Sequence, residues 1–163
     1  MAREWVDIEE PSNPKKFPSF SYSIRLGSYP SLERAKKAAD IYGKRGLFAY
    51  WAKVELTKGV WYRVFTGHFE DRRQAERFRK EHGLTEAKVN KAPYANLIGI
   101  YSYGDEVHNQ ILLLKNLGYS PYVINGHDGE TQLFVGTFLT KAGAERQGRE
   151  LRSNGIQSEV VQR

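Results

Sequence analysis

The sequence predicts an α+β protein made of two similar modules, each with the element order βαββαβ. One observation is a repeat, because Gly67-His68-Phe69 followed by Ala75 is echoed by Gly136-Thr137-Phe138 followed by Ala144. A second is that extended and helical periodicity alternate in the same order twice along the chain. This order gives a four-stranded antiparallel sheet with two helices on one face. The other face of each sheet is then expected to stay open for a ligand.

The chain divides into a tail and two modules. Residues 1–18 contain three prolines and no periodicity, which is typical of a linker or tail. The first module is placed at residues 19–91 and the second at residues 94–163, and the join is so short that the two are expected to touch. The repeat extends to the first strand of each module, where Ile24-x-Leu26-x-Ser28-Tyr29 is matched with Ile98-x-Ile100-x-Ser102-Tyr103.

In the first module, apolar and polar residues alternate over 20–27, which is the period of a half-buried strand. Ser31 is expected to cap a helix that ends near Gly43 to Gly46. Strands at 48–56 and 61–66 follow, joined by a turn at Lys58-Gly59. Asp71 is expected to cap a second helix that ends at Gly83, and residues 87–89 form the fourth strand.

The second module repeats this order. Strands are expected at residues 97–101, 122–124, 133–135 and 156–161, with a hairpin turn in the Asn-Gly-His-Asp-Gly sequence of residues 125–129. One helix carries Val107, Ile111 and Leu114, and the other spans 144–151. The apolar run at residues 111–114 exceeds what one helix face can bury, so it is expected to pack against the first module or a protein partner.

Composition limits the function classes. The chain has no cysteine, which excludes a disulfide framework and thiol catalysis. It has no transmembrane run and no signal-peptide core, so any targeting segment is expected to lie outside this chain. Residues 1–92 hold 19 Lys and Arg against 12 Asp and Glu, whereas residues 93–163 hold 6 against 7. Attraction of an anionic ligand is therefore expected at the first module.

The motifs of the first module resemble those of the SPOR (sporulation-related repeat) domain family. The residues that carry the resemblance are the segment 22–29, Ala35, Gly46, the segment 61–64, Gly67, Phe69 and Ala75. They cover about residues 20 to 90 and, more weakly, 95 to 162, so the chain resembles a tandem SPOR pair. The resemblance implies a ribonucleoprotein-like (RNP-like) fold, no cofactor, and non-catalytic binding of peptidoglycan. It also implies glycan strands denuded of stem peptides as the partner, and a location in the cell envelope, periplasmic or extracellular.

The resemblance also implies a site. The family has a Gln and, three residues later, a Ser on its first strand, and a Trp and an Arg two apart on its third. Strand alternation separately places Ser23 with Arg25, and Phe65 with the Trp and Arg positions, on the open face. Rings stack on apolar sugar faces and guanidinium groups bridge sugar oxygens. The candidate glycan-binding residues are Ser23, Arg25, Ser28, Trp61, Arg63 and Phe65.

The Arg in place of the family's Gln suggests a finer hypothesis. Removal of the stem peptide frees the lactyl carboxylate of muramic acid, which Arg25 and Arg63 could bind together. In the second module the corresponding residues are expected to be Gly99, Glu130 and Gln132, with only Ser102 kept. The second module is therefore interpreted as a degenerate repeat that extends or braces the first module, or that binds a different ligand.

Two other function classes remain as alternatives. A single-stranded RNA-binding module fits the same element order and the basic first module, although the nearest match to the RNA-binding consensus, at residues 45–50, precedes the wrong strand. A protein-interaction domain fits the apolar run in the second module. An enzyme is disfavoured, because the four histidines lack metal-ligand spacing and no paired carboxylates stand out.

Overall fold

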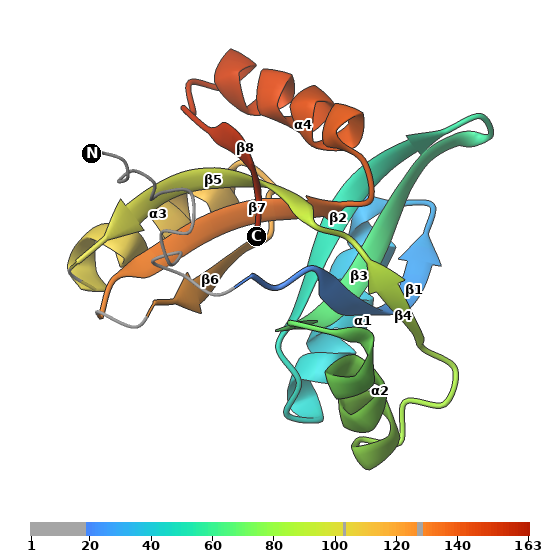
Figure 1. Ribbon diagram of the computed structural model, residues 1–163. Coiled ribbons are helices and arrows are strands. Elements are labelled where there is room, and N and C mark those ends of the chain that lie inside the picture. Colours follow the sequence, from blue (N-terminus) through green and yellow to red (C-terminus); the bar gives the residue numbers. More distant parts are fainter. Residues whose placement is uncertain (1–18, 103, 127–128) are drawn as a thin grey trace, which may run out of the picture.

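The computed structural model describes residues 19–102, 104–126 and 129–163, and it shows two βαββαβ modules side by side (Figure 1). The first module consists of β1 (Tyr22–Tyr29), α1 (Leu32–Lys44), β2 (Ala49–Leu56), β3 (Gly59–Phe69), α2 (Arg72–Glu81) and β4 (Lys88–Lys91). The second consists of β5 (Tyr94–Tyr101), α3 (Gly104–Asn116), β6 (Pro121–Asn125), β7 (Thr131–Phe138), α4 (Lys141–Ser153) and β8 (Glu159–Gln162). The predicted fold class is therefore confirmed.

Both sheets have the same topology. Their strand orders are β2-β3-β1-β4 and β6-β7-β5-β8, and every neighbouring pair is antiparallel. The two helices of each module follow its first and third strands, as the βαββαβ order requires. The first helix-side core contains Ile24, Leu26, Ala35, Val64 and Ala75, and the second contains Leu114, Leu133, Val135, Leu151 and Ile156.

Side-chain caps fix where three helices begin. The hydroxyl oxygen of Ser31 accepts a hydrogen bond from the Arg34 amide, and a carboxylate oxygen of Asp71 accepts one from the Gln74 amide. Each cap satisfies one of the unpaired amides of a first helical turn, as the sequence predicts. Thr140 caps α4 in the same way, so this helix starts at Lys141, three residues before the predicted start.

The repeated glycines serve the geometry of the sheets. Gly67 and Gly136 have φ angles of +74° and +81°, and each lies where the pairing of the first and third strands of its module is interrupted by a bulge. A Cβ atom on Gly67 would lie 2.5 Å from Cε2 of Phe69. Only glycine adopts this conformation without strain. The carbonyl oxygen of each glycine accepts a hydrogen bond from a buried tyrosine hydroxyl, that of Tyr50 at 2.9 Å and of Tyr122 at 2.8 Å.

The helix-free faces of the two sheets pack against each other over part of their area. The rings of Tyr50 and Tyr122, which occupy equivalent positions in the two modules, stack with their centroids 4.3 Å apart. Around them lies a shared apolar cluster that includes Ala52, Phe65, Ala95, Ile124 and Phe134. The expectation of an open sheet face is therefore wrong for the centre of the first sheet, because the second module covers these aromatic residues.

A buried guanidinium group ties the two modules together. The side chain of Arg163 is only 3% exposed and donates hydrogen bonds to the Ser23 hydroxyl, the Tyr50 hydroxyl and the Ala92 carbonyl oxygen. Its guanidinium carbon lies 5.7 Å from the ring centroid of Tyr122. Thus one arginine from the second module contacts β1, β2 and the join between the modules, which fixes their relative position.

The apolar run on α3 is only partly buried. Leu114 is fully covered, whereas Leu112 and Leu113 are 47% and 44% exposed. Leu112 and Leu113 are therefore not buried against the first module.

None of the described helices combines the length and apolar character needed to span a bilayer.

Candidate functional site

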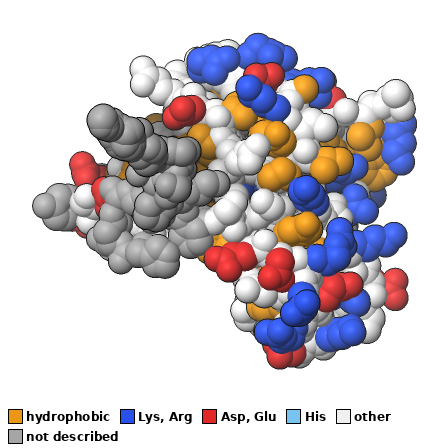
Figure 2. Space-filling view, in the orientation of Figure 1, with side chains coloured by type: hydrophobic (Ala, Val, Ile, Leu, Met, Phe, Trp, Pro, Cys, Tyr) orange, Lys and Arg blue, Asp and Glu red, His pale blue; other side chains and the backbone are white. Residues whose placement is uncertain are grey.

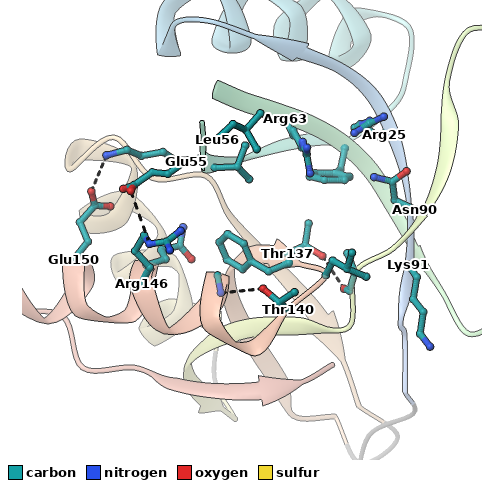
Figure 3. Close-up of a pocket in the computed structure, with 18 of the residues that line it drawn as sticks. Arg25, Glu55, Leu56, Arg63, Asn90, Lys91, Thr137, Thr140, Arg146 and Glu150 are labelled. Carbon is teal, nitrogen blue, oxygen red and sulfur yellow. Dashed lines mark hydrogen bonds and ion pairs between the residues drawn. The ribbon is translucent and has the colours of Figure 1, made fainter. Parts of the chain in front are cut away.

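A groove of about 550 Å³ lies between the two modules, beside the packed centre of the sheets (Figure 3). One wall comes from β1, β2, β3 and β4 of the first module, and the other from the end of β7 and the first turns of α4. The lining includes Phe65 of β3 and Phe138 of β7, together with polar and charged side chains of both modules. In Figure 2, apolar side chains are visible between α4 at the top and the β2–β3 hairpin at the right, with Lys and Arg side chains around them.

Two of the predicted site residues, Arg25 and Arg63, line the same part of this groove. Arg25 pairs with Phe65 across β1 and β3, and Arg63 pairs with Ser28. Among the described residues neither guanidinium group has an acidic partner, and Nε of Arg63 is buried without a hydrogen-bond partner. Burial lowers the pKa of Arg63, and the adjacent positive charge of Arg25 lowers it further. Because arginine stays protonated nonetheless, these two side chains form a cationic end of the groove that can accept an anion.

Ser28 reaches the same face through a β-bulge. Residues three apart on a regular strand point to opposite faces. Between Arg25 and Gly27 the pairing with β3 shifts by one residue, so that Gly27 lies opposite Val64 and Ser28 opposite Arg63. Since cross-strand partners share a face, Arg25, Ser28 and Arg63 lie on one side of the sheet. Ser28 is exposed at the end of β1.

Trp61 lies at the edge of this surface rather than in the groove. It pairs with Val54, whose side chain lines the groove, but Trp61 is not itself a lining residue. The ammonium group of Lys58 lies 4.7 Å from the centroid of the Trp61 ring. Because the ring is only partly buried, it offers a stacking surface next to the groove.

Ser23 and Phe65 do not offer surface to a large ligand in this structure. Ser23 is fully buried, and its hydroxyl bonds to the Gly67 carbonyl oxygen at 2.8 Å and to the Arg163 guanidinium at 2.6 Å. Phe65 is 2% exposed and packs on Tyr50 within the shared cluster. Strand alternation placed both on the helix-free face, but could not show that the second module covers this part of it.

The second module has lost the polar residues of this surface. Tyr22 and Tyr94 pair with Phe69 and Phe138, and Gly27 and Gly99 each lie against the hydroxyl of the tyrosine two residues later. The positions equivalent to Arg25, Ser28, Trp61 and Arg63 are therefore Leu97, Ile100, Glu130 and Gln132. The expected match of Arg25 with Gly99, and of Ser28 with Ser102, is therefore wrong by two residues.

The wall contributed by α4 is a feature that the sequence did not reveal. Leu139, Thr140, Gly143 and Arg146 line the groove opposite the first module. Leu139 is 65% exposed, which is the largest value among the exposed large apolar side chains of the described residues. A large apolar residue directly before a Thr cap is a weak signal, and nothing local indicates that it faces the other module.

Two ion pairs link the modules at the opposite end of the groove. The ammonium nitrogen of Lys53 lies 3.0 Å from a carboxylate oxygen of Glu150, and Nε of Arg146 lies 3.8 Å from one of Glu55 (Figure 3). Each pair joins β2 of the first module to α4 of the second. The charges at this end are thus compensated, whereas Arg25 and Arg63 have no acidic partner in the part of the chain that the structure describes.

The His, Asp and Glu side chains of the described residues do not form a metal site. They contain no group of three or more His, Asp or Glu side chains placed to hold a metal ion. His68 is largely buried, and burial together with the charge of Arg163 lowers the pKa of its imidazole to about 4. It contacts the ring of Phe20 edge-on, which is a packing role.

The first module matches the model of a known protein family. The family model of the SPOR domain matches residues 18–83, which correspond to most of the first module. No curated protein and no solved structure matched the chain.

Proposed function

We propose that this chain binds glycan strands denuded of stem peptides, because most of its first module matches the family model of the SPOR domain, a non-catalytic peptidoglycan-binding module. The proposed contact surface consists of Arg25, Ser28, Trp61 and Arg63. Members of this family occur in cell-envelope and division proteins, so the proposed role is to localise the protein to the envelope, at sites such as the septum where stem peptides have been removed.

The observation that carries the proposal is the pair of guanidinium groups, from Arg25 and Arg63, that line the same groove. An intact stem peptide is attached to muramic acid through an amide, whereas its removal leaves a carboxylate. Two arginine side chains that have no acidic partner among the residues with a described position favour the carboxylate, because charge-assisted hydrogen bonds are stronger than neutral ones. The partly buried setting of Arg63 strengthens this attraction by limiting the access of water.

The test is co-sedimentation with purified sacculi before and after amidase removal of stem peptides. We expect wild-type binding to rise on stripping, and Arg63→Ala to weaken it by about 10- to 100-fold, which corresponds to loss of one or two charged hydrogen bonds. Arg77→Ala is the matched control, because it removes the same charge from an exposed position on α2. Equal binding by the two variants would contradict the assignment of Arg63.

Arg25 allows a test of the carboxylate itself. Arg25→Gln restores the residue type that the family has at this position and removes one charge. We expect binding to persist with a shallower dependence on salt, because exposed charge interactions are screened by salt. An unchanged salt dependence would refute a role for Arg25 in binding the carboxylate.

The structure gives less support to the alternatives. A single-stranded RNA sheet needs exposed aromatic rings on its open face, but on this face Tyr50 of β2 and Phe65 of β3 are only 1% and 2% exposed. For a protein partner, the supporting observation is the exposed set of leucines on and after α3, namely Leu112, Leu113 and Leu117. These leucines lie outside the groove and leave the glycan proposal unaffected.

A further inference from the structure

Residues of both modules line the groove beside Arg25 and Arg63. The contact residues proposed above all belong to the first module and do not account for the second wall. This wall is the loop and first turns of α4, where Leu139 and Arg146 face β2 and β3. Leu139 is mostly exposed although it lies next to the buried Phe138. An exposed leucine at the rim of a groove with an apolar floor is suited to cover the apolar face of a ligand.

The charges give the groove a direction. At one end Lys53 with Glu150, and Arg146 with Glu55, neutralise each other. At the other end Arg25 and Arg63 have no acidic partner among the described residues. Apolar side chains of both modules, including Leu56 and Leu139, also line the groove. The groove therefore suits a ligand with an anionic group at one end and an apolar face beside it.

We propose that one segment of a denuded glycan strand lies between the two modules, its carboxylate on Arg25 and Arg63 and an apolar sugar face on Leu139. This inference rests on the proposed function and extends it, because it makes the second module a part of the binding site. The volume of about 550 Å³ falls within the range of about 300–1,000 Å³ that is usual for small-molecule pockets, which suits a short segment of the strand.

The packing of the modules explains why the ligand is confined to the groove. Tyr50 and Phe65, which would otherwise extend the aromatic surface across the sheet, are covered by Tyr122 and its neighbours. What remains accessible of the helix-free face is the part near Arg25, Ser28 and Arg63, together with the edge at Trp61. The second module thus removes the broad sheet surface and replaces it with a second wall.

The first experiment compares Leu139→Glu with Leu112→Glu. Both leucines are exposed and belong to the second module, but Leu112 lies on α3, away from the groove. We expect Leu139→Glu to weaken binding to denuded glycan by about tenfold or more, because it removes apolar contact and places a negative charge near the ligand's carboxylate. Leu112→Glu should change binding by less than about twofold. Equal urea midpoints for the two variants verify that both remain folded.

A second experiment uses the absence of cysteine from the chain. Leu139→Cys and Leu112→Cys each provide a unique thiol for a bulky maleimide. Modification at position 139 should block binding of soluble denuded glycan strands, and these strands should slow the modification. Modification at position 112 should do neither.

The outcomes separate this inference from the proposed function. If the wild-type protein does not bind denuded glycan, the proposed function fails and this inference fails with it. If the wild type binds and Arg63→Ala loses binding, but the variants and the label at Leu139 have no effect, the inference alone is overturned. Loss of binding at both Arg63 and Leu139, with normal binding by the Leu112 variants, supports the shared groove.

Discussion

The stacked tyrosines between the modules lead to a prediction about stability. Tyr122 is 3% exposed, its ring lies 4.3 Å from that of Tyr50 and 5.6 Å from that of Phe134, and its hydroxyl donates to the Gly136 carbonyl oxygen. Truncating a buried aromatic residue to alanine costs about 3–5 kcal/mol. For Tyr122→Ala we expect a loss of about 4 kcal/mol, because the cavity opens inside the shared cluster and the hydrogen bond is lost as well.

The assay is urea unfolding followed by two signals. Two of the three tryptophans, Trp51 and Trp61, belong to the first module, so in a Trp5→Phe background fluorescence reports that module alone. Far-ultraviolet circular dichroism reports both modules. With a urea dependence of about 2 kcal/mol per molar, Tyr122→Ala should lower both midpoints by about 2 M. Tyr122→Phe removes only the hydroxyl group and should lower the free energy of unfolding by about 1 kcal/mol.

The decisive feature is that a substitution in the second module should destabilise the first. Leu112→Ala is the control, because a side chain that is 47% exposed on α3 should change either midpoint very little. If Tyr122→Ala leaves the tryptophan transition unchanged while the circular dichroism splits into two steps, the modules unfold independently. The reasoning that places the shared cluster at the centre of the fold would then be refuted.

Two further predictions concern a buried histidine and a bulge glycine. The folded pKa of His68, about 4, lies below the value of about 6.5 for an unfolded chain, so only the unfolded state takes up a proton between these pH values. The free energy of unfolding should therefore fall by about 2 kcal/mol between pH 7 and pH 5. Urea unfolding of His68→Gln should not show this fall, and an equal fall in both proteins would contradict the buried neutral imidazole. Gly67→Ala should lower the free energy of unfolding in urea by at least about 2 kcal/mol, because φ is +74° and the added Cβ meets Phe69. Gly43→Ala is the control: its added Cβ meets nothing within 4 Å, so it should leave stability unchanged or raise it.

Local chemistry predicted the elements of this fold well. The Ser31 and Asp71 caps and the alternation in β1 and β3 are short-range patterns, and the structure contains each of them. Strand boundaries were predicted less accurately. β5 begins at Tyr94, three residues before its predicted start, and β7 ends at Phe138, three residues after its predicted end. The first strands of the modules were matched two residues out of register, because the pattern Ile-x-Ile-x-Ser-Tyr at residues 98–103 imitates that of residues 24–29, whereas the strand pairing makes Tyr94 equivalent to Tyr22.

The sequence predicted only the residues that the first module contributes to the candidate site. Strand alternation and the family resemblance identified Arg25 and Arg63, which the structure brings to the same groove. The burial of Ser23 and Phe65, and the position of Leu139, depend on how two modules pack across a join of a few residues. That packing is set by surfaces distant in sequence, and hydrophobic periodicity alone cannot distinguish an open sheet face from one that another module covers.

The divergence of the second module and the packing of the two sheets have one physical explanation. At the positions of Ser23 and Arg25 the second module has Ala95 and Leu97, and both belong to the shared apolar cluster. A serine and an arginine there would have to be desolvated against Tyr50 and Phe65, which costs free energy unless partners are supplied. The apolar replacements avoid this cost and gain burial. The loss of polar residues in the repeat is thus what lets the second module cover the first sheet, and the strip left uncovered, with its two arginines, becomes one wall of the groove.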